Sequence, residues 1–304
     1  MSAPDIPITV APAAERPALR LMRRYMENPL AVLGLLLLLA LAIPSALAPW
    51  VAPQNPYDLA GLDIFESQLP PGSVSETTGI TYWLGTDGQA RDVLSAMLFG
   101  MRTSLFVAVV SVAGALAIGA TVGIVAAYFG GVLDAVLMRI VDIQLSFPAI
   151  LVALILLAVL GQGVDKVIIA LVVTQWAYFA RTARGAALVE RNREYVLAAR
   201  SLAMGSGWII LRHMLPNCLP PLIVIATIDL AHAIGAEATL SFLGIGVPVT
   251  EPSLGMLIAN GFEFLMSGQY WISFFPGIAL ALLILGINLV GDHLRDILNP
   301  RNSQ

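Results

Sequence analysis

The sequence predicts an all-α polytopic membrane protein with six transmembrane helices, and two observations carry this prediction. Of the 304 residues, 58% are hydrophobic and only 12% are charged, whereas a soluble domain carries about 25% charged residues. Long apolar runs recur along the chain, most of them close to the ~20 residues that a helix needs to cross a bilayer. A globular core of this length does not need so much apolar surface, so we interpret the runs as membrane spans.

The first 28 residues are rich in Pro and Ala and then basic, which is typical of a tail outside the membrane. The apolar run at 29–51 follows this tail and predicts the first transmembrane helix. A cleaved signal peptide is the alternative, because the letters ALAPW at 46–50 resemble a cleavage site. The basic leader is long for a signal peptide and Pro49 would follow the cut, so the transmembrane helix is the preferred interpretation.

Residues 52–100 form an acidic, proline-containing stretch with no Lys or Arg before Arg91. This composition predicts a loop-rich insert outside the membrane, with a short helix near its end. We expect Asp87, Arg91 and Asp92 to cap and fix that short helix. Reception of an external partner protein is the alternative role for these three charges.

The region 101–291 carries five further apolar spans, at 103–127, 136–160, 166–181, 217–240 and 272–291. The span at 166–181 is short, so we expect it to run on through Ala183 with its end held by neighbouring helices. Small residues recur at every fourth position of the span 103–127 and predict a face that another helix approaches closely: Ala115, Gly119, Gly123 and Ala127. Ordinary enrichment of Gly and Ala in membrane helices is the alternative explanation.

The arginines predict the orientation of the spans. Most basic residues lie in the N-terminal tail, around the segment 189–217 and in the C-terminal tail 292–304. Because loops rich in Lys and Arg stay in the cytoplasm, we expect both termini and the segment 189–217 to be cytoplasmic. The acidic insert then faces outward.

The sequence also excludes several classes of function. Lys166 is the only lysine, and its surroundings, GQGVDKVII, do not match the G-x-x-x-x-G-K-[ST] loop whose lysine meets nucleotide phosphates. The chain therefore carries no Walker-A motif, and we expect no cofactor in it. No H-E-x-x-H and no metal-ligand spacing occurs. Cys218 is the only cysteine, which excludes an internal disulfide. A membrane-embedded enzyme is disfavoured, because no nucleophile, metal or cofactor constellation is present.

The segment 189–217 interrupts the apolar sequence with charge. Four of its residues recur at helical spacing and predict one face of a short helix: Tyr195, Ala198, Ala199 and Leu202. Gly205 begins a Gly-Ser-Gly sequence that breaks the pattern, and a second short helix, Trp208–Met214, is expected to end before Pro216. The narrow small-residue face suits a partner's groove. A helix lying on lipid headgroups is the alternative.

Three ionisable residues lie in the span 217–240: Asp229, His232 and Glu237. Buried charges in membranes are costly and face a cavity or a partner. The functional hypothesis is that they line a translocation pathway, with Asp229 contacting a charged substrate amine. The alternative is an internally satisfied polar pair, or for Glu237 a structural bond to the following loop.

The segment REYVLAARSLAMGSGWIILRHMLPN, at 193–217, resembles the EAA loop of ABC-importer permeases, in the version of the dipeptide/oligopeptide/nickel branch. That version has E-Y-V-x-A-A-R-x-x-G followed by H-x-L-P-N. Leu197 stands where the motif has a glutamate, and Ala203 stands where it has a glycine. We expect the displaced Gly205 to supply the turn instead.

Other segments agree with this branch from about Asn28 to Arg301. They are NPLAVLGLLLLLALAIPSALAPWVAP (28–53), WLGTDGQARDVLSAMLFGMRTSL (83–105), EATLSFLGIGVPVTEPSLGMLI (237–258) and FFPGIALALLILGINLVGDHLRDILNPR (274–301). Four positions depart from the branch pattern, with Ala90 at a usual glycine, Ala96 at a usual arginine, Phe99 at a usual tyrosine and Asn299 at a usual aspartate.

The resemblance implies the type I permease fold of ABC importers, in a bacterial inner membrane. It implies a second homologous permease, two ATPase subunits that bind ATP and magnesium, and an external binding protein that delivers substrate; membrane lipid is the remaining partner, and no nucleic acid is expected. Di- or oligopeptides are the leading substrate, and nickel chelates, glutathione and some sugars, which the branch also handles, are the alternatives. The residues expected to couple the chain to an ATPase are Glu194, Tyr195, Ala198, Ala199, Arg200, Leu202, Ala203 and Gly205.

An ion-driven secondary transporter is the alternative function. In that hypothesis Asp229, His232 and Glu237 form a proton relay, and the EAA-like loop has no role. Dependence of uptake on ATP favours the importer, whereas loss of uptake with the proton gradient favours the secondary transporter.

Overall fold

The computed structural model describes residues 25–58, 62–248 and 250–298. It confirms the all-α prediction. The expectations for the tails before residue 25 and after residue 298 lie outside the described residues. The helices are α2 (Pro29–Ala46), α3 (Ala48–Val51), α4 (Val93–Phe129), α5 (Gly131–Ser146), α6 (Ala149–Leu160), α7 (Val164–Arg191), α8 (Glu194–Ser201), α9 (Ser206–Ile209), α10 (Leu215–Phe242), α11 (Leu254–Phe262) and α12 (Trp271–Leu298).

The shorter elements lie between these helices. A π-helical turn, Ile210–Met214, joins α9 to α10, and two 3-10 turns cover Ile64–Glu66 and Leu265–Ser267. Strands β1 (Ser73–Val74) and β2 (Thr81–Tyr82) pair antiparallel.

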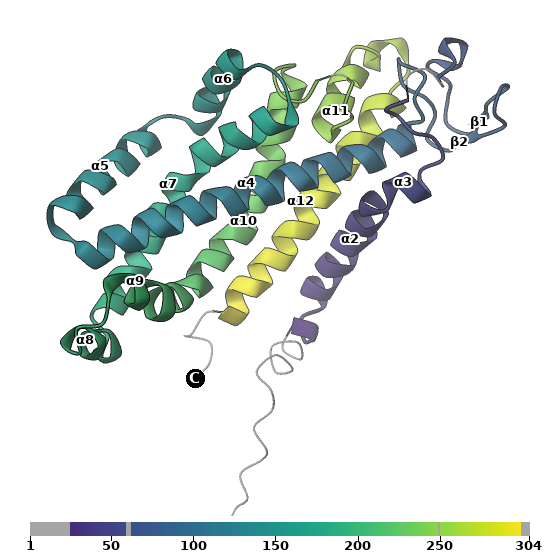
Figure 1. The fold of residues 1–304 in the computed structure, drawn as a ribbon. Coiled ribbons are helices and arrows are strands. Elements are labelled where there is room, and N and C mark those ends of the chain that lie inside the picture. Colours follow the sequence, from purple (N-terminus) through teal and green to yellow (C-terminus); the bar gives the residue numbers. More distant parts are fainter. Residues whose placement is uncertain (1–24, 59–61, 249, 299–304) are drawn as a thin grey trace, which may run out of the picture.

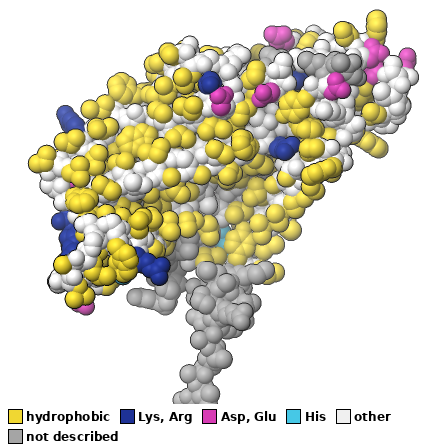
Figure 2. Space-filling model, in the orientation of Figure 1, with side chains coloured by type: hydrophobic (Ala, Val, Ile, Leu, Met, Phe, Trp, Pro, Cys, Tyr) yellow, Lys and Arg dark blue, Asp and Glu magenta, His cyan; other side chains and the backbone are white. Residues whose placement is uncertain are grey.

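The two ends of the elongated molecule differ (Figure 1). The start of α2, the end of α12 and the hairpin of α8 and α9 lie at one end, and β1, β2 and α11 lie toward the other. The Asn28 side chain lies 3.3 Å from Nδ1 of His293, which ties the start of α2 to α12. On the face seen in Figure 2, Lys and Arg side chains gather around α8 and α9, while most acidic side chains lie toward the strands.

The first predicted span is a helix of the expected kind. Asn28 caps α2 by accepting a hydrogen bond from the Leu30 amide at 3.0 Å, and Pro29 occupies the first helical position, where its missing N–H costs nothing. Gly34 lets α2 lie against α12, because a Cβ at this position would meet Cβ of Leu289 at 2.4 Å.

The boundary predicted at residue 100 falls inside a helix, so the short helix expected there is wrong. It is the first part of α4, which runs unbroken from Val93 to Phe129 and is about 55 Å long at ~1.5 Å per residue. Asp92 caps this helix, since its carboxylate accepts hydrogen bonds from the Ser95 amide at 2.8 Å and the Ser95 hydroxyl at 2.6 Å. The insert therefore ends at Asp92.

The structural role expected for Asp87, Arg91 and Asp92 is confirmed. Arg91 is fully buried, and its guanidinium contacts Oδ2 of Asp87 from Nε at 2.8 Å and from Nη2 at 2.7 Å. The amide of Arg91 also donates to the Asp87 carboxylate at 3.0 Å. The buried pair thus fixes the turn that leads into α4.

A second carboxylate organises the rest of the insert. Glu66 is buried and accepts hydrogen bonds from the Tyr82 hydroxyl at 2.6 Å and the Ser75 hydroxyl at 2.7 Å. Burial by itself raises the pKa of Glu66, but the hydrogen bonds from Tyr82, Ser75 and Thr77 outweigh it and hold the pKa below its usual value. An ionised Glu66 thereby joins the first 3-10 turn to β2.

The span predicted at 136–160 is not one straight helix. Two helices, α5 and α6, replace it and are bent by 88° relative to each other. Pro148 has no amide proton and disfavours helical angles at the residue before it, and Phe147 is accordingly extended, with φ −95° and ψ 140°. The residues Phe147-Pro148 therefore break the span.

The six-span count remains a prediction. Four helices among the described residues are long and apolar enough to cross a membrane, and the number rises to five if the bent pair α5–α6 is one broken span. Helix α7 does form, and it extends well past the predicted 166–181. It is less apolar because it carries several charged residues, namely Asp165, Lys166, Arg181, Arg184, Glu190 and Arg191.

The second short helix expected at Trp208–Met214 does not end before Pro216. Helices α9 and α10 form one continuous helix, Ser206–Phe242, through the π-helical turn Ile210–Met214. A proline inside an α-helix removes a hydrogen bond and clashes with the carbonyl one turn earlier. The wider π-helical turn directly before Pro216 relieves this conflict, so the helix continues.

The small-residue face of α4 is confirmed as a packing surface. A Cβ at Gly119 would lie 2.4 Å from the Trp176 carbonyl oxygen, and a Cβ at Gly123 would lie 2.3 Å from that of Ala180. The two glycines therefore bring α4 against the backbone of α7, as Figure 1 shows.

Candidate functional site

The hairpin of α8 and α9 turns at an alanine. Helix α8 ends in a Schellman arrangement, in which the Met204 amide donates to the Ala199 carbonyl at 3.2 Å and the Ala203 amide to the Arg200 carbonyl at 2.9 Å. Ala203 occupies the left-handed position with φ +55°, whereas Gly205 has an ordinary φ of −60°. The expectation that Gly205 supplies the turn is therefore wrong.

Ala203→Gly is expected to stabilise this turn by about 1 kcal/mol, because a left-handed conformation strains an alanine and not a glycine. Hydrogen exchange of the Met204 amide should slow by about fivefold. Gly205→Ala is the matched control and should change the exchange little, since nothing lies within 4 Å of a Cβ there. A larger effect at Gly205 than at Ala203 would contradict this assignment.

The helix face predicted on α8 is partly wrong. Ala199 is only 5% exposed and Val196 is fully buried, because both pack into the main hydrophobic core with Ile209 and Met214. The side that points away from the core is apolar too. We call it the α8–α9 surface, and its exposed members are Tyr195, Leu197, Ala198, Leu202, Met204, Trp208 and Leu211.

Two arginines, one at the end of α7 and one in α8, bind the end of α4. Arg191 donates to the Ala127 carbonyl at 2.8 Å, and Arg200 donates to the Tyr128 carbonyl at 3.3 Å. The Arg200 guanidinium also lies 4.3 Å from the centre of the Tyr128 ring. Cations are favourable at a helix C-terminus, where carbonyls lack helical partners. The arginines therefore hold the hairpin rigidly on the helix core.

Tyr195 links three elements at this end of the molecule. Its hydroxyl donates to the Glu190 carboxylate in α7 and accepts a hydrogen bond from the Asn217 amide in α10 at 2.9 Å. Partial burial and the bond to Glu190 raise the pKa of Tyr195 to about 12, so the hydroxyl keeps its proton. Glu194 begins α8 and is exposed.

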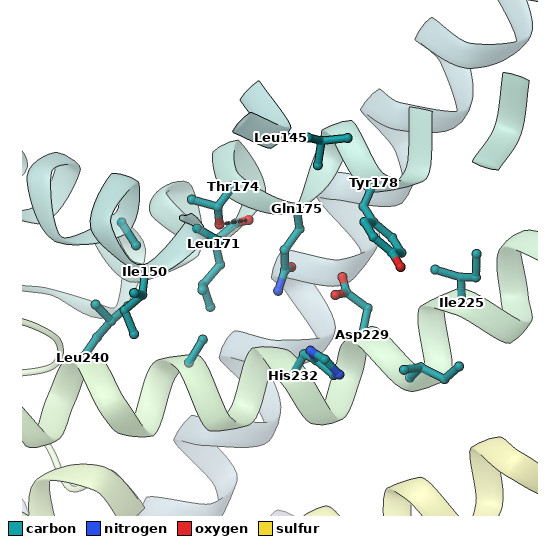
Figure 3. Close-up of a pocket in the computed structure, with 14 residues that line it drawn as sticks. Leu145, Ile150, Leu171, Thr174, Gln175, Tyr178, Ile225, Asp229, His232 and Leu240 are labelled. Atoms are coloured by element: carbon teal, nitrogen blue, oxygen red, sulfur yellow. Dashed lines mark hydrogen bonds between the residues drawn. The ribbon is translucent and has the colours of Figure 1, made fainter. Parts of the chain in front are cut away.

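A cavity of about 470 Å³ lies between α6, α7 and α10; we call it the α7–α10 cavity. Asp229 and His232 both line it, as predicted for residues of a pathway. Figure 3 shows Asp229 and Gln175 facing each other across it from α10 and α7, with Tyr178 nearby. Among the described residues, Oδ2 of Asp229 and Oε1 of Gln175 are buried and have no hydrogen-bond partner.

Glu237 does not line this cavity, so its place in the predicted pathway is wrong. It is fully buried and accepts hydrogen bonds from the Ser104 hydroxyl of α4 at 2.6 Å and the Ser241 hydroxyl at 2.8 Å. Ser241 in turn accepts from the Val247 amide in the loop after α10. Glu237 is therefore a structural link between helices.

Sequence reasoning missed two residues of the cavity. Gln175 and Tyr178 are both polar positions in a predicted span, and that polarity was the available signal. They lie three residues apart on α7, which places them on one helix face. The spacing alone did not show that this face meets Asp229.

Comparisons with known proteins place this arrangement among transport proteins. Residues 119–304 match the family described as binding-protein-dependent transport system inner membrane component. Residues 17–71 match the N-terminal TM domain of oligopeptide transport permease C. The two matches together include both the hairpin and the cavity.

Relatives agree along nearly the whole chain. A putative peptide transport system permease protein of Brucella abortus is 40% identical over 99% of this chain and 95% of its own length. The dipeptide transport system permease protein DppC of Bacillus subtilis is 36% identical over 92% and 84%. The probable D,D-dipeptide transport system permease protein DdpC of Escherichia coli is 35% identical over 90% and 88%.

A solved structure shares the fold. A chain of the MetNI methionine ABC transporter in an inward-facing conformation aligns with a TM-score of 0.54 at 22% identity. The alignment covers 67% of this chain and 96% of that chain.

Proposed function

Because this chain belongs to the family of binding-protein-dependent transport system inner membrane components, we propose that it is a permease subunit of an ATP-driven importer of di- or oligopeptides. The three relatives described above are named as peptide and dipeptide permeases, which supports this substrate class. The α8–α9 surface carries the proposal. It is apolar and exposed at one end of the molecule, and Arg200 of α8 joins it to the end of α4.

The α8–α9 surface docks an ATPase subunit in this proposal. Leu202 is 77% exposed and Trp208 is 48% exposed. Tryptophan and tyrosine are enriched among the residues that dominate the binding energy of protein interfaces, and Trp208 and Tyr195 both belong to this surface. A displacement of α8 is transmitted to α4 through Arg200. It is transmitted to α7 and α10 through Tyr195. Movement of the ATPases thereby reaches the helices that line the α7–α10 cavity.

The proposal implies a set of partners, because ATP hydrolysis takes place in separate subunits. Two ATPase subunits bind ATP and magnesium, a second homologous permease completes the pore, and an external binding protein delivers the substrate. In this proposal the cytoplasmic end is the one that carries the α8–α9 hairpin, the start of α2 and the end of α12 (Figure 1). The opposite end, with the insert and α11, receives the binding protein outside a bacterial inner membrane.

The positions of the ionisable residues of α10 disfavour a proton-driven transporter. A relay through Asp229, His232 and Glu237 needs the three groups to exchange protons. Glu237 is instead enclosed by Ser104 and Ser241 and lies outside the cavity that Asp229 and His232 line. Uptake by the reconstituted complex should therefore require ATP hydrolysis and continue after a proton ionophore is added.

Leu202→Asp is expected to lower the coupled uptake of dipeptide at least tenfold, because a desolvated charge at an apolar interface costs more than ~1.4 kcal/mol. The measurement is ATP-dependent uptake into proteoliposomes that hold both permeases, both ATPases and the binding protein. Co-purification of the ATPases should fall in parallel.

Asn192→Asp is the matched control, since it adds the same charge at an exposed position just before α8 and should keep full uptake. If Leu202→Asp assembles with the ATPases and transports normally, the α8–α9 surface is not the docking site. If uptake by the wild type does not depend on ATP and stops when the ionophore is added, the proposed function as an ATP-driven importer is wrong.

A further inference from the structure

The α7–α10 cavity has the size and chemistry of a small-molecule site. Its volume of about 470 Å³ falls within the roughly 300–1,000 Å³ that such sites occupy. Most of its wall is aliphatic, with side chains such as Leu171, Ile225 and Leu240. The few polar groups converge from α7 and α10, as Figure 3 shows. An apolar wall with a few convergent polar groups is the usual composition of a ligand site.

Two acceptor atoms in the cavity have no hydrogen-bond donor among the described residues. Oδ2 of Asp229 and Oε1 of Gln175 are buried acceptor atoms, and neither has a partner in the described ranges. Buried polar atoms in native structures are nearly always paired. Asp229 lies about 20 Å along α10 from Leu215, at ~1.5 Å per residue, so its carboxylate is far from the helix end. Two neighbouring orphan acceptors at this depth indicate a missing donor.

The missing donor is best matched by a cation. Among the described residues, no Lys or Arg lines the cavity. The ionisable side chains that do line it are Asp229, His232 and Tyr178. A carboxylate inside a membrane protein faces a partner of opposite charge or a water-filled path. An ammonium group carries one positive charge and three donors, enough to serve both acceptors at once.

We propose that Asp229 and Gln175 bind the free N-terminal ammonium group of a small peptide in the α7–α10 cavity. This inference rests on the proposed function and names the part of the substrate that the permease itself recognises. The aliphatic wall accommodates apolar side chains of the peptide without selecting among them. Asp229 thus makes a free amine a requirement within the pore, separate from any selection by the binding protein.

The test uses the assembled transporter of two permeases and two ATPases in lipid nanodiscs, without the binding protein. Isothermal titration calorimetry measures the Kd of Ala-Ala and of N-acetyl-Ala-Ala, which differ only in the charged amine. The wild type should bind Ala-Ala at least about tenfold more tightly, the range of a charge-assisted hydrogen bond. Asp229→Asn should reduce this ratio to near one, and Gln175→Leu should weaken Ala-Ala more than its acetylated form.

Asp165→Asn is the matched control, because it removes a carboxylate of α7 that pairs with Lys166 at 2.6 Å outside the cavity. It should keep the wild-type ratio. An unchanged ratio in Asp229→Asn, no discrimination by the wild type, or no binding of either peptide overturns the inference. Loss of the second permease from purified Asp229→Asn complexes also overturns the inference. The positively charged partner of Asp229 would then be a side chain of that second permease and not a peptide.

The two proposals fail in different ways. ATP-dependent peptide uptake by the wild type with its binding protein leaves the proposed function standing, whatever the binding ratio is. Absence of that uptake refutes the proposed function directly.

Discussion

Replacing Gly123 with valine is expected to prevent stable folding of the permease. Even a single Cβ at this position would lie 2.3 Å from the Ala180 carbonyl oxygen, 2.8 Å from the Ala183 Cβ and 2.8 Å from the Arg184 amide nitrogen. Two of these atoms belong to the backbone of α7, so no side-chain rotation relieves the clash. Overpacking costs about 1–3 kcal/mol where side chains yield, and we expect the upper end of this range or more.

The measurement is the amount of folded permease in membranes and the thermal midpoint of the purified complex. Gly185→Ala is the matched control, because Gly185 lies on α7 with nothing within 4 Å of a Cβ. It should leave the midpoint unchanged or raise it slightly, since alanine favours a helix. Normal levels of a stable Gly123→Val protein would show that α4 and α7 do not pack as described.

Arg91→Met is expected to destabilise the end of the molecule that carries β1 and β2 by about 3–5 kcal/mol, because removing one partner of a buried ion pair leaves the other charge uncompensated. Arg91 is 0% exposed and Asp87 is 1% exposed, so water cannot replace the lost guanidinium. The turn that this pair fixes leads directly into α4. Chemical denaturation of the purified complex, followed by tryptophan fluorescence, measures the loss.

The double variant Asp87→Asn with Arg91→Met should recover much of that loss, because no buried charge remains unpaired and the Asn oxygen still accepts from the amides of Gln89 and Arg91. Arg102→Met, which removes an exposed arginine of the same helix region, should cost less than about 0.5 kcal/mol. Equal effects of Arg91→Met and Arg102→Met would mean that the buried pair contributes no special stability.

The departures from the family motif acquire a physical meaning in the structure. Ala90 and Ala203 both stand where the motif has glycine, and they adopt φ values of +60° and +55°. A glycine reaches these angles without strain, whereas an alanine does not. The sequence comparison could mark the two positions as unusual, but only the backbone angles show what the usual glycine does there.

The predictions that held depend on local chemistry. Long apolar runs predict helices because each backbone amide must find a partner within its own segment in lipid. Asp92 caps α4, and Gly119 and Gly123 face a neighbouring helix, because capping and helical spacing act within a few residues. The bend at Phe147-Pro148 was not predicted, although the proline was a local signal for it.

Long-range packing decided the rest. Ala199 and Leu202 share the helical spacing of one face in the sequence, yet Ala199 turns into the core and Leu202 remains 77% exposed. Glu237 and Asp229 are both carboxylates on α10, but only Glu237 meets the Ser104 hydroxyl of α4. Which residues a helix face contacts depends on where the neighbouring helices lie. The sequence of a single chain does not contain the distances between its helices.

By itself, the sequence determined the helical membrane class, the family and the position of the hairpin between α7 and α10. These depend on hydropathy, charge and short motifs, which are properties of neighbouring residues. Only the tertiary structure decided which side of α8 is free to bind a partner and which polar residues of α7 meet Asp229 in a cavity. Both outcomes arise from the packing of helices distant in the chain, where burial removes some side chains from contact and leaves others without a donor.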